Sequence, residues 1–215
     1  MEQAVAQTIA RAQHIRVLVD LACGDALLGV HLSRLANAEL IGIDSAIATI
    51  SASKNAHLSR NSRALVAADF SALPLNGRSV QCVVSLDGLY LAPHPLRALQ
   101  EIRRILSITG SLIFTVYTAD GPVPGGAVLR SDWQQLLYEA GFSRVHAANV
   151  TEEWRRIMSK KHAARLLRAE TLTRRFGARA DAELAVSAAM LGVFGPAFLN
   201  LVRRWEITAD GQFRK

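Results

Sequence analysis

The sequence predicts an α/β protein with a doubly wound, mostly parallel sheet covered by helices on both faces. Through the first two thirds of the chain, short and nearly all-apolar runs alternate with longer segments of helical periodicity. Strands that are buried on both faces carry such unbroken apolar runs, because helices shield each side from water. We expect strands at 17–21, 40–43, 64–68, 80–85 and 112–117 and helices at 27–35, 47–58 and 96–106, the last of them stopped by Gly110.

The last third of the chain has a different pattern. A helix at 132–140 ends at Gly141, and a strand follows at 143–150. A mostly helical stretch then precedes a final strand near 201–207, and an insertion of this kind beside a sheet edge is a natural lid over a substrate. We therefore expect one domain over residues 1–215, made of a core at 1–150, a helical lid at 151–200 and a last strand at 201–215.

Composition agrees with a globular protein of one domain, since 50% of the 215 residues are hydrophobic and 20% are charged. Cys23 and Cys82 lie in apolar runs and lack metal-ligand spacing, which predicts reduced thiols in a cytoplasmic protein without a metal site. The N-terminus lacks the pattern of a signal peptide. Residues 184–202 carry no charge, but Gly195 and Pro196 interrupt them, which favours a buried helix and a turn over a membrane span.

The net charge of +7 is concentrated in one part of the chain. Residues 154–175 hold eight basic side chains and a single acid, Glu170. Such a run is typical of a solvated helix face. It also leaves open an anionic partner, either an acidic small molecule or nucleic acid.

The turn after the first strand lies where open parallel sheets bind ligands. Residues 20–29 read D-L-A-C-G-D-A-L-L-G, which is one glycine short of the dinucleotide-binding fingerprint. Ala26 adds a Cβ at the position where a pyrophosphate would approach, and Asp25 adds a negative charge beside it. The turn therefore argues against NAD. It is compatible with S-adenosylmethionine, which has no phosphate and carries a sulfonium cation.

Acidic residues recur where later strands end. Asp44 follows the second strand at the spacing from which a carboxylate reaches ribose hydroxyls. Asp69 precedes Phe70, which sets an acceptor for an adenine amine beside an aromatic wall, and Asp87 follows the fourth strand. Each acid alone is typical of a turn or a helix N-cap. Four carboxylates at one sheet edge, counting Asp20, predict a ligand site.

In order and spacing, residues 15–150 resemble the class I S-adenosylmethionine-dependent methyltransferases. The matching segments are 17–29, 40–46, 66–75, 82–95, 101–118 and 131–142. The resemblance implies a seven-stranded sheet whose last strand is antiparallel, with S-adenosylmethionine as cofactor. It places Asp20, Cys23 and Gly24 at the methionine end, Asp44 and Ser45 at the ribose, Asp69 and Phe70 at the adenine, and Ser85 and Leu86 under the cofactor. Ala26 departs from the family, which commonly has a second glycine there.

The methyl acceptor is less constrained by the sequence. Residues 85–88 read S-L-D-G, whereas family members that methylate amino groups of bases or glutamine often carry Asn/Asp-Pro-Pro-Tyr there. This favours a small-molecule acceptor, hydrophobic or anionic or both. Tyr90 and His94 are the catalytic candidates, with His94 as a general base, although a histidine between two prolines is also typical of an exposed turn. Trp154 and Met158, at helical spacing in the insertion, are candidates for an apolar lid face, although such residues are more typical of a core. Phe194 and Phe198 are candidates to line the acceptor pocket.

Three other functions are compatible with the sequence. The basic excess is compatible with an RNA methyltransferase, although no added RNA-binding module is visible. The chain is also compatible with a cofactor-binding protein that has lost or exchanged methyl transfer, because fold and function separate easily. A nicotinamide oxidoreductase is the third, and a homodimer is compatible with all of them.

Overall fold

The computed structural model describes residues 9, 14–47, 50, 62–119, 132–178, 181 and 202–210. The contacts of the chain divide it into two compact units. The larger unit comprises Glu2–Val116, Asp132–Ala148 and Glu206–Lys215. The smaller comprises Tyr117–Ser131 and Asn149–Trp205, together with Met1.

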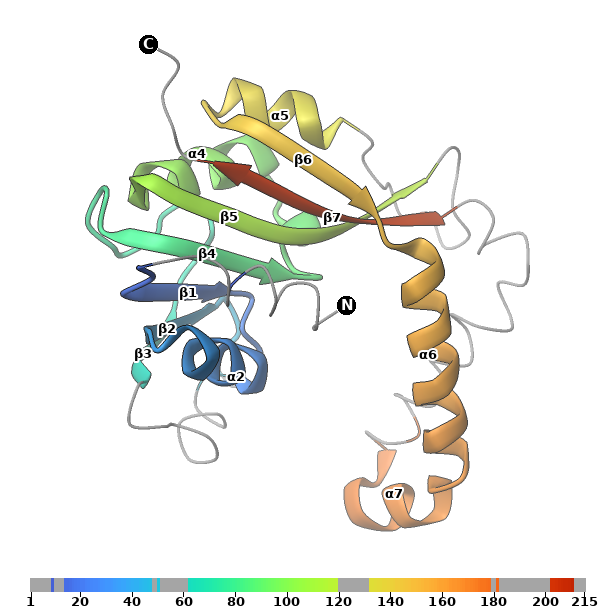
Figure 1. The fold of residues 1–215 in the computed structure, drawn as a ribbon. Helices are drawn as coiled ribbons and strands as arrows, with labels where there is room; N and C mark the ends of the chain where they lie inside the picture. The colour runs from blue at the N-terminus through green and yellow to red at the C-terminus, as the bar shows by residue number, and fades with distance from the viewer. Residues whose placement is uncertain are drawn as a thin grey trace. The chain divides into compact units, whose positions relative to one another are not determined.

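Seven strands form one sheet in the order β3-β2-β1-β4-β5-β7-β6 (Figure 1). They are β1 (Val17–Leu21), β2 (Glu39–Asp44), β3 (Ser62–Ala67), β4 (Val80–Leu86), β5 (Leu106–Ala119), β6 (Ser143–Asn149) and β7 (Val202–Asp210). β1 pairs in parallel with β2 and β4, β2 with β3, and β4 with β5. The central strands are buried on both faces, as their apolar runs predict. The predicted doubly wound, mostly parallel sheet is confirmed.

The last strand runs against its neighbour β5. The Ser111 hydroxyl donates to Asp210 Oδ1 at 3.0 Å, and the indole N–H of Trp205 donates to Thr118 Oγ1 at 3.0 Å. Rising residue numbers on β5 therefore face falling numbers on β7, which is antiparallel pairing (Figure 1). This is the seven-stranded arrangement that the resemblance implies.

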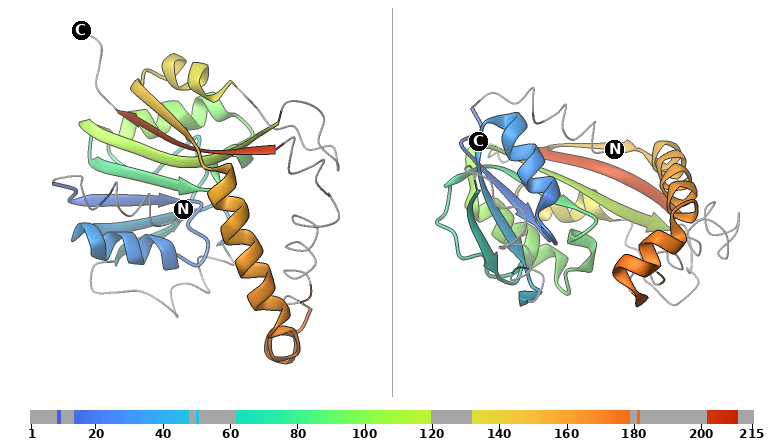
Figure 2. Two further views of the ribbon diagram at one scale, coloured as in Figure 1. Left: turned by 45° about the vertical axis from the view of Figure 1, so that its right-hand side comes forward. Right: turned by 90° about the horizontal axis from the view of Figure 1, so that it is seen from below.

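Helices cover both faces of the sheet, with α2 on one side and α4 and α5 on the other (Figure 2). The helical elements are α2 (Leu27–Ala36), the short 3₁₀ helix η1 (Leu89–Leu91), α4 (Pro95–Ile105), α5 (Trp133–Glu139), α6 (Thr151–Leu166) and α7 (Ala169–Phe176). The sequence of α4 explains its position. Leu99 and Ile102 are buried on one stripe, whereas Arg97 and Gln100 on the other stripe are exposed.

One boundary differs from the prediction. Helix α4 ends at Ile105, and β5 begins at Leu106, whereas we expected Gly110 to stop the helix and the strand to start at 112. The β-branched Ile108 and Thr109 favour strand over helix. Gly110 lies inside β5, where a Cβ would come within 3.0 Å of the Val80 carbonyl oxygen. The glycine thus permits a close approach of β4 and β5 instead of ending a helix.

Two predicted elements fall mainly outside the described residues. Of the helix expected at 47–58, only Ile47 and Ile50 are described, and of the uncharged stretch 184–202 only Val202 is described. Among the helices that the structure describes, none is both long enough and apolar enough to cross a membrane.

Aromatic side chains form a core within the smaller unit. The ring of Trp154 on α6 packs edge-on against the ring of Tyr117, with centroids 5.5 Å apart. Arg204 is 1% exposed and stacks its guanidinium over Tyr117, 5.3 Å from the ring centroid. Trp154 is 3% exposed, so this side chain serves as core, the more typical role for a tryptophan at such a position. The lid at 151–200 stays a prediction.

Replacing Phe114 with alanine is expected to destabilise the larger unit strongly. Phe114 on β5 is fully buried, and its ring meets Trp133 of α5 edge-on at 5.6 Å. Removing a buried phenylalanine ring from a close-packed core lowers the free energy of unfolding by about 3–5 kcal/mol. Ile108→Ala is the control, because Ile108 lies on the same strand and is 53% exposed. Equal losses of unfolding free energy for both variants in denaturant titrations would contradict this placement of Phe114.

Candidate functional site

The loop after β1 folds back onto the end of β2. Ala22, Gly24 and Ala26 all have left-handed backbone conformations, with φ of 60°, 53° and 60°. The Cys23 N–H donates to the Ile43 carbonyl at 3.1 Å, which ties the loop to β2. A left-handed alanine costs roughly 1–2 kcal/mol, so the surrounding contacts hold this loop in a strained shape.

Ala26 does not point where the sequence argument placed it. Its side chain is 1% exposed and belongs to a buried cluster with Cys23, Ile50 and Leu65. The methyl group therefore faces the interior and does not crowd the open edge of the sheet. The prediction that the Ala26 Cβ crowds a pyrophosphate is therefore wrong. Only the negative charge beside the loop disfavours NAD.

Asp44 joins the ends of β1 and β2. Its Oδ2 accepts a hydrogen bond from the Gly24 N–H at 2.9 Å, and its Oδ1 accepts one from the Ala46 N–H at 2.9 Å. Each carboxylate oxygen has a second lone pair, so further donors can bind without breaking these bonds. Ser45 beside it is exposed.

Asp20 is a buried carboxyl group behind this loop. It is 3% exposed, and its Oδ2 has no hydrogen-bond partner in the described part of the chain. Its pKa is raised to about 7, mainly by burial; a hydrogen bond from the Gly29 backbone amide partly offsets this, and the nearby carboxylates of Asp44 and Asp25 contribute to the rise. Gly29 leaves room for this carboxyl, because a Cβ there would lie 2.7 Å from Asp20 Oδ2.

The Cys23 thiol responds to the same electrostatic environment. Its pKa is raised to about 12, mainly by burial, with smaller contributions from Asp20 and Asp44. The thiol is therefore neutral and unreactive at physiological pH. Asp44 and Asp25 raise the pKa values of both Asp20 and Cys23 beyond the effect of burial, so the loop has a negative potential, which favours a cationic ligand over an anionic pyrophosphate.

Asp69 lies at the end of β3, as predicted, and it is exposed. Its Oδ1 accepts hydrogen bonds from the Ser71 N–H at 2.7 Å and from the Ser71 hydroxyl. These hydrogen bonds, with a smaller contribution from His94, lower the pKa of Asp69, so the side chain is an ionised acceptor. Phe70 beside it is half-buried.

Asp87 is held by a residue that sequence reasoning missed. The Thr115 hydroxyl on β5 donates to Asp87 Oδ1 at 2.9 Å and accepts from the Asp87 N–H at 3.0 Å. This pair stabilises the left-handed conformation of Asp87, whose φ is 58°. The next residue, Gly88, approaches the β1 loop so closely that a Cβ there would lie 2.3 Å from the Ala22 Cβ. A glycine after an aspartate was the available signal for this tight turn.

The remaining predicted residues lie around the end of β4. Ser85 is fully buried, with no hydrogen-bond partner for its Oγ among the described residues, and Leu86 is half-buried. Tyr90 lies on η1 and is half-buried, and His94 is exposed at the start of α4. No group of three or more histidine, cysteine or acidic side chains in the described ranges is placed to hold a metal ion.

Asp20→Asn is expected to change how the free energy of unfolding depends on pH. The Asp20 carboxyl titrates near 3.8 when unfolded and near 7 when folded. Between these values the folded state holds a proton that the unfolded state has lost, so this group lowers wild-type stability by up to ~1.4 kcal/mol for each pH unit of rise. The neutral asparagine lacks this dependence. Asp20→Asn should therefore gain stability relative to the wild type as pH rises through this interval.

Asp25→Asn is the matched control for that measurement, because Asp25 is an exposed acid in the same loop. Denaturant titrations at about pH 4.5 and about pH 8 give the comparison. A difference between Asp20→Asn and wild type that is the same at both pH values would contradict the raised pKa.

The chain is similar in sequence to a known family and in fold to known proteins. Residues 19–114 match the methyltransferase domain family. No sequence among the curated proteins matches the chain. Three similar solved structures are the [4+2]-cyclase SpnF, a phosphoethanolamine N-methyltransferase 2 of Haemonchus contortus in complex with S-adenosyl-L-methionine, and the cyclopropane synthase MmaA2 of Mycobacterium tuberculosis.

The likeness to these structures lies in the fold. SpnF is 18% identical with a TM-score of 0.77, and the match covers 98% of this chain and 81% of SpnF. The Haemonchus enzyme is 13% identical with a TM-score of 0.80, over 99% of this chain and 52% of that one. MmaA2 is 13% identical with a TM-score of 0.75, over 96% of this chain and 81% of its own. With the domain match over residues 19–114 and the sheet order, these likenesses show that the chain has the fold of the class I S-adenosylmethionine-dependent methyltransferases.

Proposed function

We propose that the protein transfers a methyl group to a small anionic acceptor, with the cofactor held at the carboxyl ends of β1, β2 and β3. The observation that carries the cofactor assignment is the group of carboxylates at the β1 loop: Asp44 accepts from the Gly24 N–H, and Asp44 and Asp25 add to the effect of burial in raising the pKa values of Asp20 and Cys23. S-adenosylmethionine supplies an activated methyl group on a sulfonium cation. A loop with these carboxylates attracts such a cation.

Each part of the cofactor has a proposed partner. Asp44, with Ser45 beside it, binds the ribose hydroxyls through the lone pairs that its bonds to Gly24 and Ala46 leave available. Asp69 accepts from the adenine amine, and Phe70 packs against the ring. The β1 loop, including Asp20, Cys23 and Gly24, borders the methionine end. Ser85 and Leu86 lie beneath the bound cofactor.

An anionic acceptor is supported by the charge distribution of α6. Arg155 and Arg156 form ion pairs with Glu152 and Glu153 at 2.8 and 2.7 Å. After Glu153 the helix contains no further acid, whereas Lys160 and Lys161 are both exposed. The second half of α6 therefore presents positive charge, which draws an acid towards it.

Tyr90 and His94 are the proposed groups on the acceptor side. Both follow the end of β4, close to the proposed cofactor residues in sequence, and His94 is near enough to Asp69 to affect its pKa. A histidine side chain can act as a general base, so His94 is the proposed group that removes a proton from the acceptor. The chain's other contribution is to orient the acceptor and exclude water, a role proposed for the lid at 151–200.

Two alternatives have an observation in their favour. The exposed lysines of α6 also suit an RNA acceptor, and a gel shift that weakens steeply with salt would support it. SpnF, a [4+2]-cyclase, has the same fold, so catalysis without methyl transfer is the second alternative. Formation of S-adenosylhomocysteine with any acceptor excludes that second alternative.

Asp44→Ala is expected to abolish micromolar binding of S-adenosylhomocysteine in calorimetric titrations. A charge-assisted hydrogen bond contributes about 1.5–3 kcal/mol, so losing the ribose contacts weakens binding by roughly tenfold to more than hundredfold. Glu39→Gln is the control, since Glu39 is exposed at the opposite end of the same strand. NADH should not bind the wild type. Undiminished binding by a folded Asp44→Ala protein would overturn the assignment of Asp44.

Lys161→Gln is expected to raise KM for an anionic acceptor and to leave the affinity for S-adenosylhomocysteine unchanged. The lysine lies on the basic half of α6 and is not among the proposed cofactor residues. Arg34→Gln on α2 is the control, because it removes an exposed charge from the larger unit. A panel of carboxylic acids and their neutral amides, assayed for S-adenosylhomocysteine release, gives the comparison. Equal turnover of acids and amides would exclude the anionic acceptor.

A further inference from the structure

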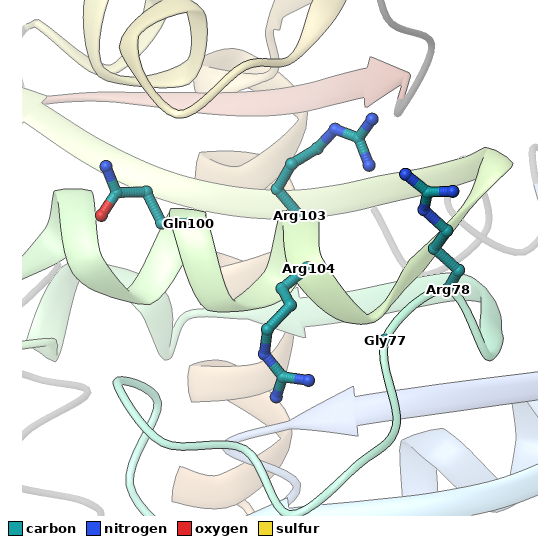
Figure 3. Close-up of a pocket in the computed structure, with 5 residues that line it drawn as sticks. All are labelled: Gly77, Arg78, Gln100, Arg103 and Arg104. Carbon is teal, nitrogen blue, oxygen red and sulfur yellow. The ribbon is translucent and has the colours of Figure 1, made fainter.

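A cavity lined by arginines lies in the larger unit, at the end of the sheet opposite to the proposed cofactor site. Its volume is about 400 Å³, and its lining consists of Gly77, Arg78, Gln100, Arg103 and Arg104. Gly77 and Arg78 precede β4, whereas the proposed cofactor residues follow the strands. None of the five lining residues is acidic. Figure 3 shows Arg78 and Arg103 pointing to the same side of α4, with Arg104 pointing to the other.

The fold itself accounts for Arg104. Its guanidinium forms an ion pair with Glu101 at 2.8 Å and donates to the carbonyls of Leu73 and Leu75 at 2.9 Å. These bonds attach the loop before β4 to the last turn of α4. Its charge is balanced by Glu101, so Arg104 has a structural role in the fold.

Backbone hydrogen bonds also join the loop before β4 to the end of α4. The N–H groups of Arg78 and Ser79 donate to the carbonyls of Arg104 and Ile105 at 2.9 Å. These carbonyls belong to the C-terminal end of α4, where a basic side chain would otherwise serve to satisfy them. The side chains of Arg78 and Arg103 are therefore not needed to cap these two carbonyls.

Arg103 is held in an unfavourable position for a cation. It is 8% exposed, and its Nε donates to the Gly141 carbonyl at 3.3 Å. Burial lowers the pKa of its guanidinium, and the positive charge of Arg78 lowers it further. Two cations kept together beside a cavity, at an electrostatic cost, are typical of a binding site for an anion.

We propose that this cavity binds a phosphate group, with Arg78 and Arg103 as its two cationic ligands and Gln100 as a neutral donor. Guanidinium groups match phosphate oxygens with paired N–H donors, and doubly charged phosphate offsets the repulsion between the two arginines. The cavity volume of about 400 Å³ leaves room for a phosphomonoester as well as for free phosphate. The site is separate from methyl transfer and goes beyond the proposed function.

Calorimetric titration with inorganic phosphate and with glycerol 3-phosphate, at constant ionic strength, tests this site. Saturable binding of either is expected, and Arg78→Gln and Arg103→Gln should each weaken it by at least about tenfold, the loss of one charge-assisted hydrogen bond. Tighter binding of the ester would identify a phosphorylated metabolite as the ligand, and equal binding would identify phosphate itself. No saturable binding of either compound overturns the proposal.

Arg97→Gln is the matched control, because Arg97 is an exposed arginine on the same helix but outside the cavity lining. If Arg97→Gln weakens phosphate binding as much as Arg78→Gln does, the effect is general surface charge and the proposal is wrong. Arg78 is exposed on a loop, so its variant gives a folded protein even if the buried Arg103 does not tolerate replacement. S-adenosylhomocysteine affinity should be the same in all these variants, which separates failure of this site from failure of the cofactor site.

Discussion

The hydrogen bond between the Gly24 N–H and the Asp44 carboxylate is the constraint on which the shape of the β1 loop depends. It joins the loop after β1 to the end of β2 and so holds a strained segment with three left-handed residues in one shape. The second bond of Asp44, to the Ala46 N–H, fixes the carboxylate itself. The same group that would bind the ribose therefore also shapes the loop that borders the methionine end.

Charge in the larger unit is separated along the strand direction. Asp20, Asp25 and Asp44 lie near the carboxyl ends of the parallel strands, where their charges add to the effect of burial in raising the pKa of Cys23. Arg78, Arg103 and Arg104 lie at the amino end of β4. Because parallel strands present all their carboxyl ends at one edge, the topology keeps these opposite charges apart and prevents their mutual neutralisation.

Periodicity and strand-end position account for what the sequence could predict. Val17–Leu21 is the strand that its apolar run indicates, and Asp44 and Asp69 lie at strand ends as expected. Two features could not be predicted from the sequence, because one depends on the direction in which a side chain points and the other on a partner far away in the chain. Nothing in the spacing shows that the Ala26 methyl faces the core, since this follows from its left-handed backbone. Thr115 meets Asp87 only after β4 and β5 pair, although 28 residues separate them.

The negative potential of the β1 loop bears on affinity more than on rate. Methyl transfer removes the positive charge from sulfur, so a carboxylate-rich loop favours the charged donor over the neutral product. The same attraction stabilises the ground state and by itself does not accelerate the chemical step, because only interactions that strengthen in the transition state do so. Rate must then come from orientation of the acceptor and exclusion of water. In the proposed function, the acids of the larger unit therefore contribute affinity for the cofactor, and the elements that receive the acceptor contribute the acceleration.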